Sequence, residues 1–203
     1  MPNSPTSARP SRSRLSRAKR LRGPRNPQAT RAALVAAARL EFEEAGFDAT
    51  HSNRIAQRAG FAPQTFYRHF SDKVEIFLAA YRSWVSEEWK ALKTAKSPDR
   101  LAETLIRHHK QSLLFRRTLR QLALAEPRVR AARAESRLEQ IERIRRRYPH
   151  LRSLSQERLA RGLLVIERIA DACAEGEFGD LGLPAEAGLA QLKEALGREL
   201  SQD

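Results

Sequence analysis

Cysteine and long apolar runs are scarce in this sequence. Cys173 is the single cysteine among 203 residues, so neither a disulfide framework nor a cysteine-based zinc cluster can form within the chain. A chain without disulfides suits a reducing compartment. No apolar run approaches the roughly 18 to 20 residues that cross a bilayer, and there is no signal-peptide core. We therefore expect a cytoplasmic protein that does not span a membrane.

Acidic residues are absent from residues 1–25, which carry eight of the basic ones. The whole chain has 38 Lys and Arg against 24 Asp and Glu, a formal net charge of +14, which favours polyanionic partners such as nucleic acid or an anionic membrane. Because residues 1–25 are rich in Ser and Pro and poor in apolar residues, we predict a disordered basic arm. An organellar transit peptide has a similar composition, but prolines break the amphipathic helix that it needs.

Glycine and strand-like alternation are rare after residue 25, where Ala, Leu, Arg and Glu dominate. This pattern predicts an all-α fold of about nine helices, with the first over residues 26–46. Asn26 and Pro27 signal its start and Gly46 its end. Asp72 and Glu75 have capping-box spacing at the start of a long helix. The expected later helices lie at roughly 98–116, 117–125, 127–148, 155–175 and 184–200.

The stretch "AGFAPQTFYRHF" follows a short helix and contains a bend at Gly60, so it predicts a helix-turn-helix. Phe66 and Phe70 fall on one side of the second helix, where they can pack against the core. The other side presents a polar set to solvent, consisting of Gln64, Thr65, Tyr67, Arg68 and His69.

The exposed polar set suits double-stranded DNA. Gln64 can pair with adenine and the Thr65 methyl group can meet a thymine methyl group, with Arg68 beside them as a further base contact. Tyr67, His69 and Lys73 can hold phosphates. Packing for Tyr67 and plain solvation for Arg68 are the alternatives that the sequence leaves open.

The segment "AGFAPQTFYRHFSDKVEIF", with "FEEAGFDATHSNRIAQRAG" before it, resembles the DNA-binding domain of the tetracycline-repressor (TetR) family over about residues 30–80. The resemblance implies a DNA-binding domain at 26–73 and an all-α effector-binding and dimerisation domain at 74–203. It also implies base contact by Pro63 and phosphate contact by Thr50. Arg54 occupies a position that is usually acidic in the family, and an added phosphate contact or a solvated side chain are both compatible with it.

The second half of the sequence contains apolar stripes with polar interruptions. Tyr81, Trp84, Glu88 and His108 fall within such arcs and can line an effector cavity or satisfy one another. The predicted dimer interface comprises Leu159, Leu163, Ile166, Ala170, Leu189, Leu192 and Leu196, although these stripes can also pack within one subunit. We interpret the Arg-rich segment 116–147 as a solvated, ion-paired helix surface.

These observations favour a sequence-specific regulator of transcription that binds DNA as a homodimer. By the family resemblance, it is a repressor released from a palindromic operator by a small-molecule effector. The basic arm would follow the minor groove or act as a non-specific tether. A non-specific, nucleoid-type nucleic-acid-binding protein is the alternative. We expect no enzyme activity, no cofactor and no metal, since the sequence shows no catalytic triad order, phosphate-binding loop or metal-spaced His and Glu residues.

Overall fold

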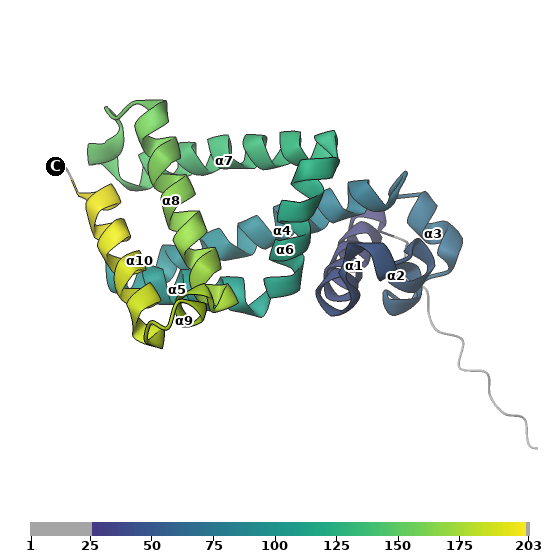
Figure 1. Ribbon diagram of the computed structural model, residues 1–203. Helices are drawn as coiled ribbons and strands as arrows, with labels where there is room; N and C mark the ends of the chain where they lie inside the picture. The colour runs from purple at the N-terminus through teal and green to yellow at the C-terminus, as the bar shows by residue number, and fades with distance from the viewer. Residues whose placement is uncertain (1–25, 202–203) are drawn as a thin grey trace, which may run out of the picture.

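The computed structural model describes residues 26–201, and every regular element in that range is helical, which confirms the predicted all-α class. The elements are α1 (Pro27–Ala49), α2 (Ser52–Arg58), α3 (Pro63–Tyr67), α4 (Lys73–Thr94), α5 (Pro98–Gln111), α6 (Leu113–Ala125), α7 (Pro127–Arg147), the 3₁₀ helix η1 (Pro149–Leu151), α8 (Gln156–Glu175), α9 (Glu177–Asp180) and α10 (Ala185–Leu200). The predicted basic arm, residues 1–25, lies outside the described residues. Figure 1 shows α1, α2 and α3 at one end of the molecule and α5, α8 and α10 at the other.

Local signals start and stop the helices as the sequence predicts. The Asn26 side chain accepts hydrogen bonds from the backbone N–H groups of Gln28 and Ala29 at the start of α1. Gly46, at φ 74°, interrupts the helical backbone near the end of α1, and this left-handed conformation favours glycine. Asp72 caps α4, because its carboxylate accepts a hydrogen bond from the Glu75 N–H at 2.8 Å.

Helix boundaries in the second half differ from the sequence prediction at two places. α5 and α6 meet at Ser112 rather than near residue 116, and Ser112 is buried with its hydroxyl donating to Glu43 Oε1 of α1 at 3.0 Å. The four-residue α9 was not expected. Between residues 26 and 201, no helix is both long enough and apolar enough to cross a bilayer.

The largest core joins α1, α2, α3 and α4 to α6. Phe66 and Phe70 are buried in it as predicted, and the Phe77 and Phe115 rings meet at a centroid distance of 5.0 Å. A second core joins α5, α8 and α10 with the end of α4. Since α6 contributes Phe115 and Leu119 to the first core, that core extends from the α1–α3 end into the second half of the chain.

A buried charge cluster joins four helices of the second half, and it comprises Glu88, His109, Arg116 and Asp171. Arg116 and Asp171 are each 3% exposed. The guanidinium binds the carboxylate with two parallel contacts, from Nε to Oδ1 at 3.0 Å and from Nη2 to Oδ2 at 2.8 Å. His109 lies between two carboxylates, with Nδ1 2.9 Å from Asp171 and Nε2 3.1 Å from Glu88.

Mutual neutralisation governs the protonation of this cluster. Burial lowers the pKa of His109, but its contacts with Asp171 and Glu88 outweigh burial and hold the pKa above its ordinary value. Burial raises the pKa of Asp171, yet the bond from His109 and the charge of Arg116 hold it well below its usual range. Removing one partner would leave an uncompensated buried charge, which typically costs about 3–5 kcal/mol.

We predict that His109 makes stability depend on pH. Because its pKa is raised on folding, its stabilising contribution is complete below about pH 6.5 and is lost as pH rises through the folded pKa. The free energy of unfolding, measured by urea denaturation, should therefore fall from about pH 6.5 upward in the natural protein. The fall should be reduced in His109→Gln and retained in His150→Gln, where the histidine is exposed. If the free energy of unfolding changed with pH equally in all three proteins, a charged His109 would be contradicted.

Candidate functional site

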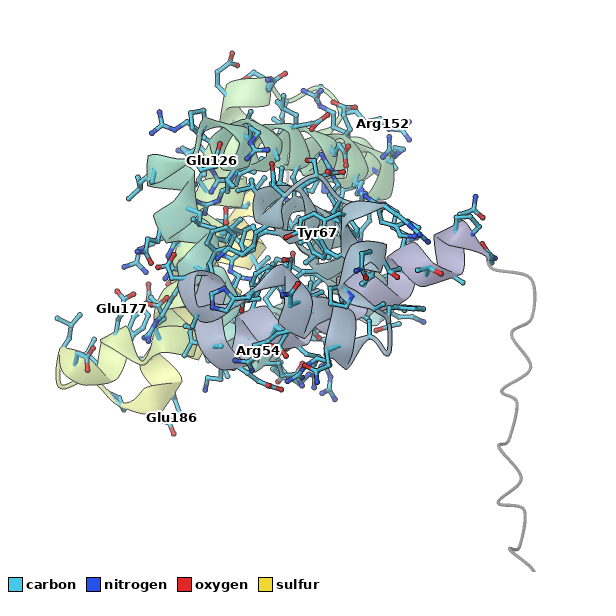
Figure 2. The ribbon with its side chains drawn as sticks, turned by 90° about the vertical axis from the view of Figure 1, so that its right-hand side faces the viewer. Arg54, Tyr67, Glu126, Arg152, Glu177 and Glu186 are labelled. Atoms are coloured by element: carbon cyan, nitrogen blue, oxygen red, sulfur yellow. The ribbon has the colours of Figure 1, made fainter. Side chains whose placement is uncertain are left out.

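The outer edge of α2 and α3 carries the polar residues that the sequence assigned to DNA. Figure 2 looks onto this end of the molecule, where Arg54 and Tyr67 both lie. Pro63, Gln64 and Arg68 are exposed, while Thr65 and His69 are half-buried. The bend between the two helices contains Gly60 at φ 76°, which lets α3 cross α2 while Phe66 points into the core.

Tyr67 links the two helices of the motif. Its side chain is 61% exposed, and its hydroxyl lies 2.8 Å from Ser52 Oγ at the start of α2. No local sequence signal marks Ser52, because its proximity to Tyr67, fifteen positions later, depends on the bend. This contact fixes both hydroxyl groups on the exposed side of α2 and α3.

Lys73 and Arg54 are held by contacts within the protein. The Lys73 ammonium donates to the Phe47 carbonyl at 2.7 Å, so it lies against the last turn of α1. Arg54 is 51% exposed and its Nε lies 3.0 Å from Glu41 Oε2, in a carboxylate that also accepts from Arg58. Glu41 therefore orients two guanidinium groups on the α2 surface.

Thr50 requires a correction. The family resemblance implied that it contacts a phosphate, but the Thr50 side chain is fully buried. Its hydroxyl donates to the backbone carbonyls of Gly46 at 2.6 Å and Glu41 at 3.2 Å. A buried, saturated hydroxyl cannot reach a DNA backbone, so Thr50 fixes the α1–α2 corner instead.

A second candidate site is a cavity lined by α4, α5, α6, α7, α8 and α10, here called the inner cavity, with about 100 Å³ of free volume. Its lining is mainly apolar, including Leu92, Leu101, Leu105, Ile144, Leu163, Ile166, Leu196 and Leu200. Tyr81, Trp84 and Glu88, three of the four residues expected there, line it. In the described part of the chain, no group of three or more His, Cys, Asp or Glu side chains is arranged to hold a metal ion.

His109 lines the inner cavity in the place expected for His108. His108 instead stacks beside the Trp84 ring, at a centroid distance of 4.6 Å, and burial lowers its pKa. Adjacent residues point about 100° apart on a helix, and the packing of α5 against α8 turns His109 toward Asp171. Helix phase alone could not decide between the two histidines.

The apolar stripes assigned to the dimer interface pack within one chain. Ala170, Leu192 and Leu196 are buried in the second core, which Ile166 and Leu189 also contact. Leu159 and Leu163 belong to a third cluster around Ile141. Leu159, Ala170, Leu192 and Leu196 are therefore buried within one subunit, which corrects their assignment. Leu163, Ile166 and Leu189 are only partly buried, so their place in a dimer interface stays a prediction. The exposed apolar residues of α8 are Leu164 and Val165.

Comparison with known proteins agrees with this geometry. The profile of the family described as "Bacterial regulatory proteins, tetR family" matches residues 34–80, which span α1 to the start of α4. No curated protein sequence matches the chain.

Solved structures share the fold along most of the chain. A putative TetR-family regulator from Rhodococcus sp. aligns with a TM-score of 0.65 and 18% identity, over 86% of this chain and 100% of its own. GusR from Salmonella enterica aligns with a TM-score of 0.62 and 21% identity, over 87% of this chain and 97% of its own. A TetR-like regulator from Rhodococcus sp. RHA1 has a TM-score of 0.56 and 21% identity, over 90% of this chain and 100% of its own.

The matched profile covers the helices that carry Gln64, Tyr67 and Arg68, and the shared fold extends over the remaining helices. Residues 34–80 therefore match the family described as "Bacterial regulatory proteins, tetR family", and the chain as a whole shares its fold with solved TetR-family regulators.

Proposed function

We propose that the protein is a repressor that binds a palindromic operator as a homodimer and leaves it when a small effector occupies the inner cavity. The exposed edge of α3 carries this proposal. Gln64 and Arg68 project from a short helix that is anchored by two buried phenylalanines, and within residues 26–201 neither side chain has a hydrogen-bond partner. Free polar groups on a rigid support are what base recognition requires.

The proposed contacts divide into two sets. Pro63, Gln64, Thr65 and Arg68 meet base edges in the major groove, where glutamine pairs with adenine and arginine with guanine. Arg54, Tyr67, His69 and Lys73 meet phosphates and set the position of the protein on the duplex. Contacts within the protein already hold Arg54, Tyr67 and Lys73 in place, so each side chain loses less conformational entropy when it binds DNA.

The proposed dimer uses the outward face of α8. Leu164 is 46% exposed and Val165 is 38% exposed, and they form an apolar pair between Arg161 and Arg168. A two-fold axis along this face would let the same residues meet their own copies in the second subunit. Two recognition helices would then face successive turns of one groove.

Coupling between cavity and DNA is proposed to run through α6. On one face of this helix, Phe115 packs in the core shared with α1, and Ser112 just before it donates to Glu43 of α1. On the other face, Arg116 lines the inner cavity and holds Asp171. A ligand that binds one position of Arg116 better than another would therefore move α6, and with it the α1–α3 end.

Selection of bound DNA tests the function. The purified protein would be incubated with genomic fragments at about 0.15 M salt, and the retained fragments would be sequenced. We expect a few enriched fragments that share a palindrome. Broad binding that disappears as salt increases would instead support the non-specific alternative.

Substitutions in α3 should separate specificity from affinity. Gln64→Ala should weaken operator binding by about 1–3 kcal/mol and relax the preference at one base pair in each half-site. Tyr67→Phe should weaken binding about equally for all sequences, because it removes a phosphate ligand and the bond to Ser52. Gln121→Ala, an exposed glutamine on α6, is the control and should change neither quantity. An unchanged sequence preference in Gln64→Ala would remove Gln64 from the proposed base contacts.

A charge on the outer face of α8 should disrupt the dimer. Leu164→Glu places like charges opposite each other across the two-fold axis, so the dimer dissociation constant should increase by about tenfold or more. Analytical ultracentrifugation would measure this constant. Leu124→Glu is the control, because Leu124 is exposed on α6, away from the proposed interface. Dissociation of both variants, or of neither, would contradict the proposed interface.

A further inference from the structure

Two hollows share a wall in the second half of the molecule. The inner cavity is one, and a groove on the solvent side of α4 and α7 is the other. Trp89 of α4 and Arg147 of α7 line both. We call the second hollow the cationic groove, since its lining includes Lys90, Lys93, Arg143, Arg146 and Arg147. A molecule lying against Trp89 and Arg147 can therefore contact both the apolar interior and the charged surface.

The cations of this groove differ from the other arginines of α7. Arg133 and Arg137 both bind Glu167, as an ion-paired helix surface requires. In the groove, Arg143 has one carboxylate neighbour at 3.6 Å. Within the described residues, the remaining four cations form no ion pair with a carboxylate. The groove is thus a concentrated positive surface with a potential that attracts anions.

Among the residues that the structure describes, every hydrogen-bond partner of Arg147 is neutral. Its Nη2 donates to the Ala95 carbonyl at 2.7 Å, and its Nε donates to the Tyr148 hydroxyl at 3.0 Å. These contacts hold the guanidinium at the mouth of the inner cavity without offsetting its charge. A partly buried charge with no counterion is unfavourable, and an anionic ligand would supply one.

Two further donors in the cavity wall lack acceptors. The indole N–H groups of Trp84 and Trp89 are buried and have no hydrogen-bond partner within the described part of the chain. Buried N–H groups are rarely left unpaired, because each loses its bonds to water. Both tryptophans line the inner cavity, so ligand oxygen atoms could accept from them.

The carboxylates of the inner cavity already have cationic partners. Glu88 accepts from His109, and Glu167 binds Arg116, Arg133 and Arg137. A cationic ligand would have to compete with these contacts. An anionic ligand would find Arg147 and the two indole N–H groups free to bind it.

We propose that the effector is an amphiphilic anion, with an apolar body in the inner cavity and a carboxylate or phosphate head at Arg147, facing the cationic groove. This inference rests on the proposed function, in which an effector occupies that cavity. It specifies the ligand by charge and polarity: an apolar chain or ring, at least one oxygen acceptor, and a negative head.

Tryptophan fluorescence of the full chain gives a direct assay, because Trp84 and Trp89 are the only two tryptophans in the sequence. The protein would be titrated with octanoate, octanol and octyltrimethylammonium, which share a chain and differ in head charge. We expect octanoate to bind at least about tenfold more tightly than either of the others. Tighter binding of the ammonium compound, or no fluorescence response to any of the three, would overturn the proposal.

Variants locate the head group. Arg147→Gln should weaken octanoate binding by about tenfold and leave octanol binding unchanged, while Arg147→Lys should retain most of the affinity for octanoate. Arg107→Gln is the matched control, because it removes an exposed positive charge from α5 on another face. An equal loss of octanoate affinity in Arg107→Gln and Arg147→Gln would mean that only the net charge of the protein matters, and it would contradict the proposed contact.

Octyl phosphate distinguishes the two kinds of head. If a doubly charged head spreads over the cationic groove, the double variant Lys90→Gln/Lys93→Gln should weaken the binding of octyl phosphate more than the binding of octanoate. If the double variant weakens the binding of both ligands slightly and equally, the head contacts Arg147 alone. Both results are consistent with an anionic effector.

Failure of the DNA selection would remove the proposed function while leaving anion binding observable. Absence of anion binding by a protein that still selects a palindrome would remove this inference alone.

Discussion

The bidentate ion pair between Arg116 and Asp171 is the contact on which the second half of the structure depends. Both side chains are almost fully buried, so each needs the other to remain charged. Through His109 the pair extends to Glu88, and four helices are thereby joined at one point. Hydrophobic burial would tolerate small rotations of these helices, whereas paired buried charges tolerate few, because each misaligned contact leaves a desolvated charge.

The position of Arg116 also explains how the two ends of the molecule share one framework. The residue just before it, Phe115, packs against Phe77 in the core that supports α2 and α3. One helix thus has a charged face toward the cavity and an apolar face toward the DNA-binding end. Because α6 contacts both the first core and the inner cavity, it is the element through which the proposed coupling would pass.

Sequence patterns were most informative where the structure depends on near neighbours. The caps at Asn26 and Asp72, the bend at Gly60 and the inward phase of Phe66 and Phe70 involve residues within about one or two helical turns of each other. Predictions failed where the packing of a chain corner or of a distant helix decided the outcome. Thr50 is buried by the α1–α2 corner, and Leu192 faces α5 and α8 of its own chain rather than a second copy.

By itself, the sequence determined the all-helical class, the helix-turn-helix and its exposed polar edge, because local periodicity and backbone preferences are properties of short segments. Tertiary structure decided which of two adjacent histidines joins the buried charge cluster, and which arginines of α7 are paired. These outcomes depend on the rotation of each helix against partners more than twenty residues away, as in the contact between His109 and Glu88. A polar residue on an apolar arc has no fixed role until packing brings its partner within hydrogen-bond distance.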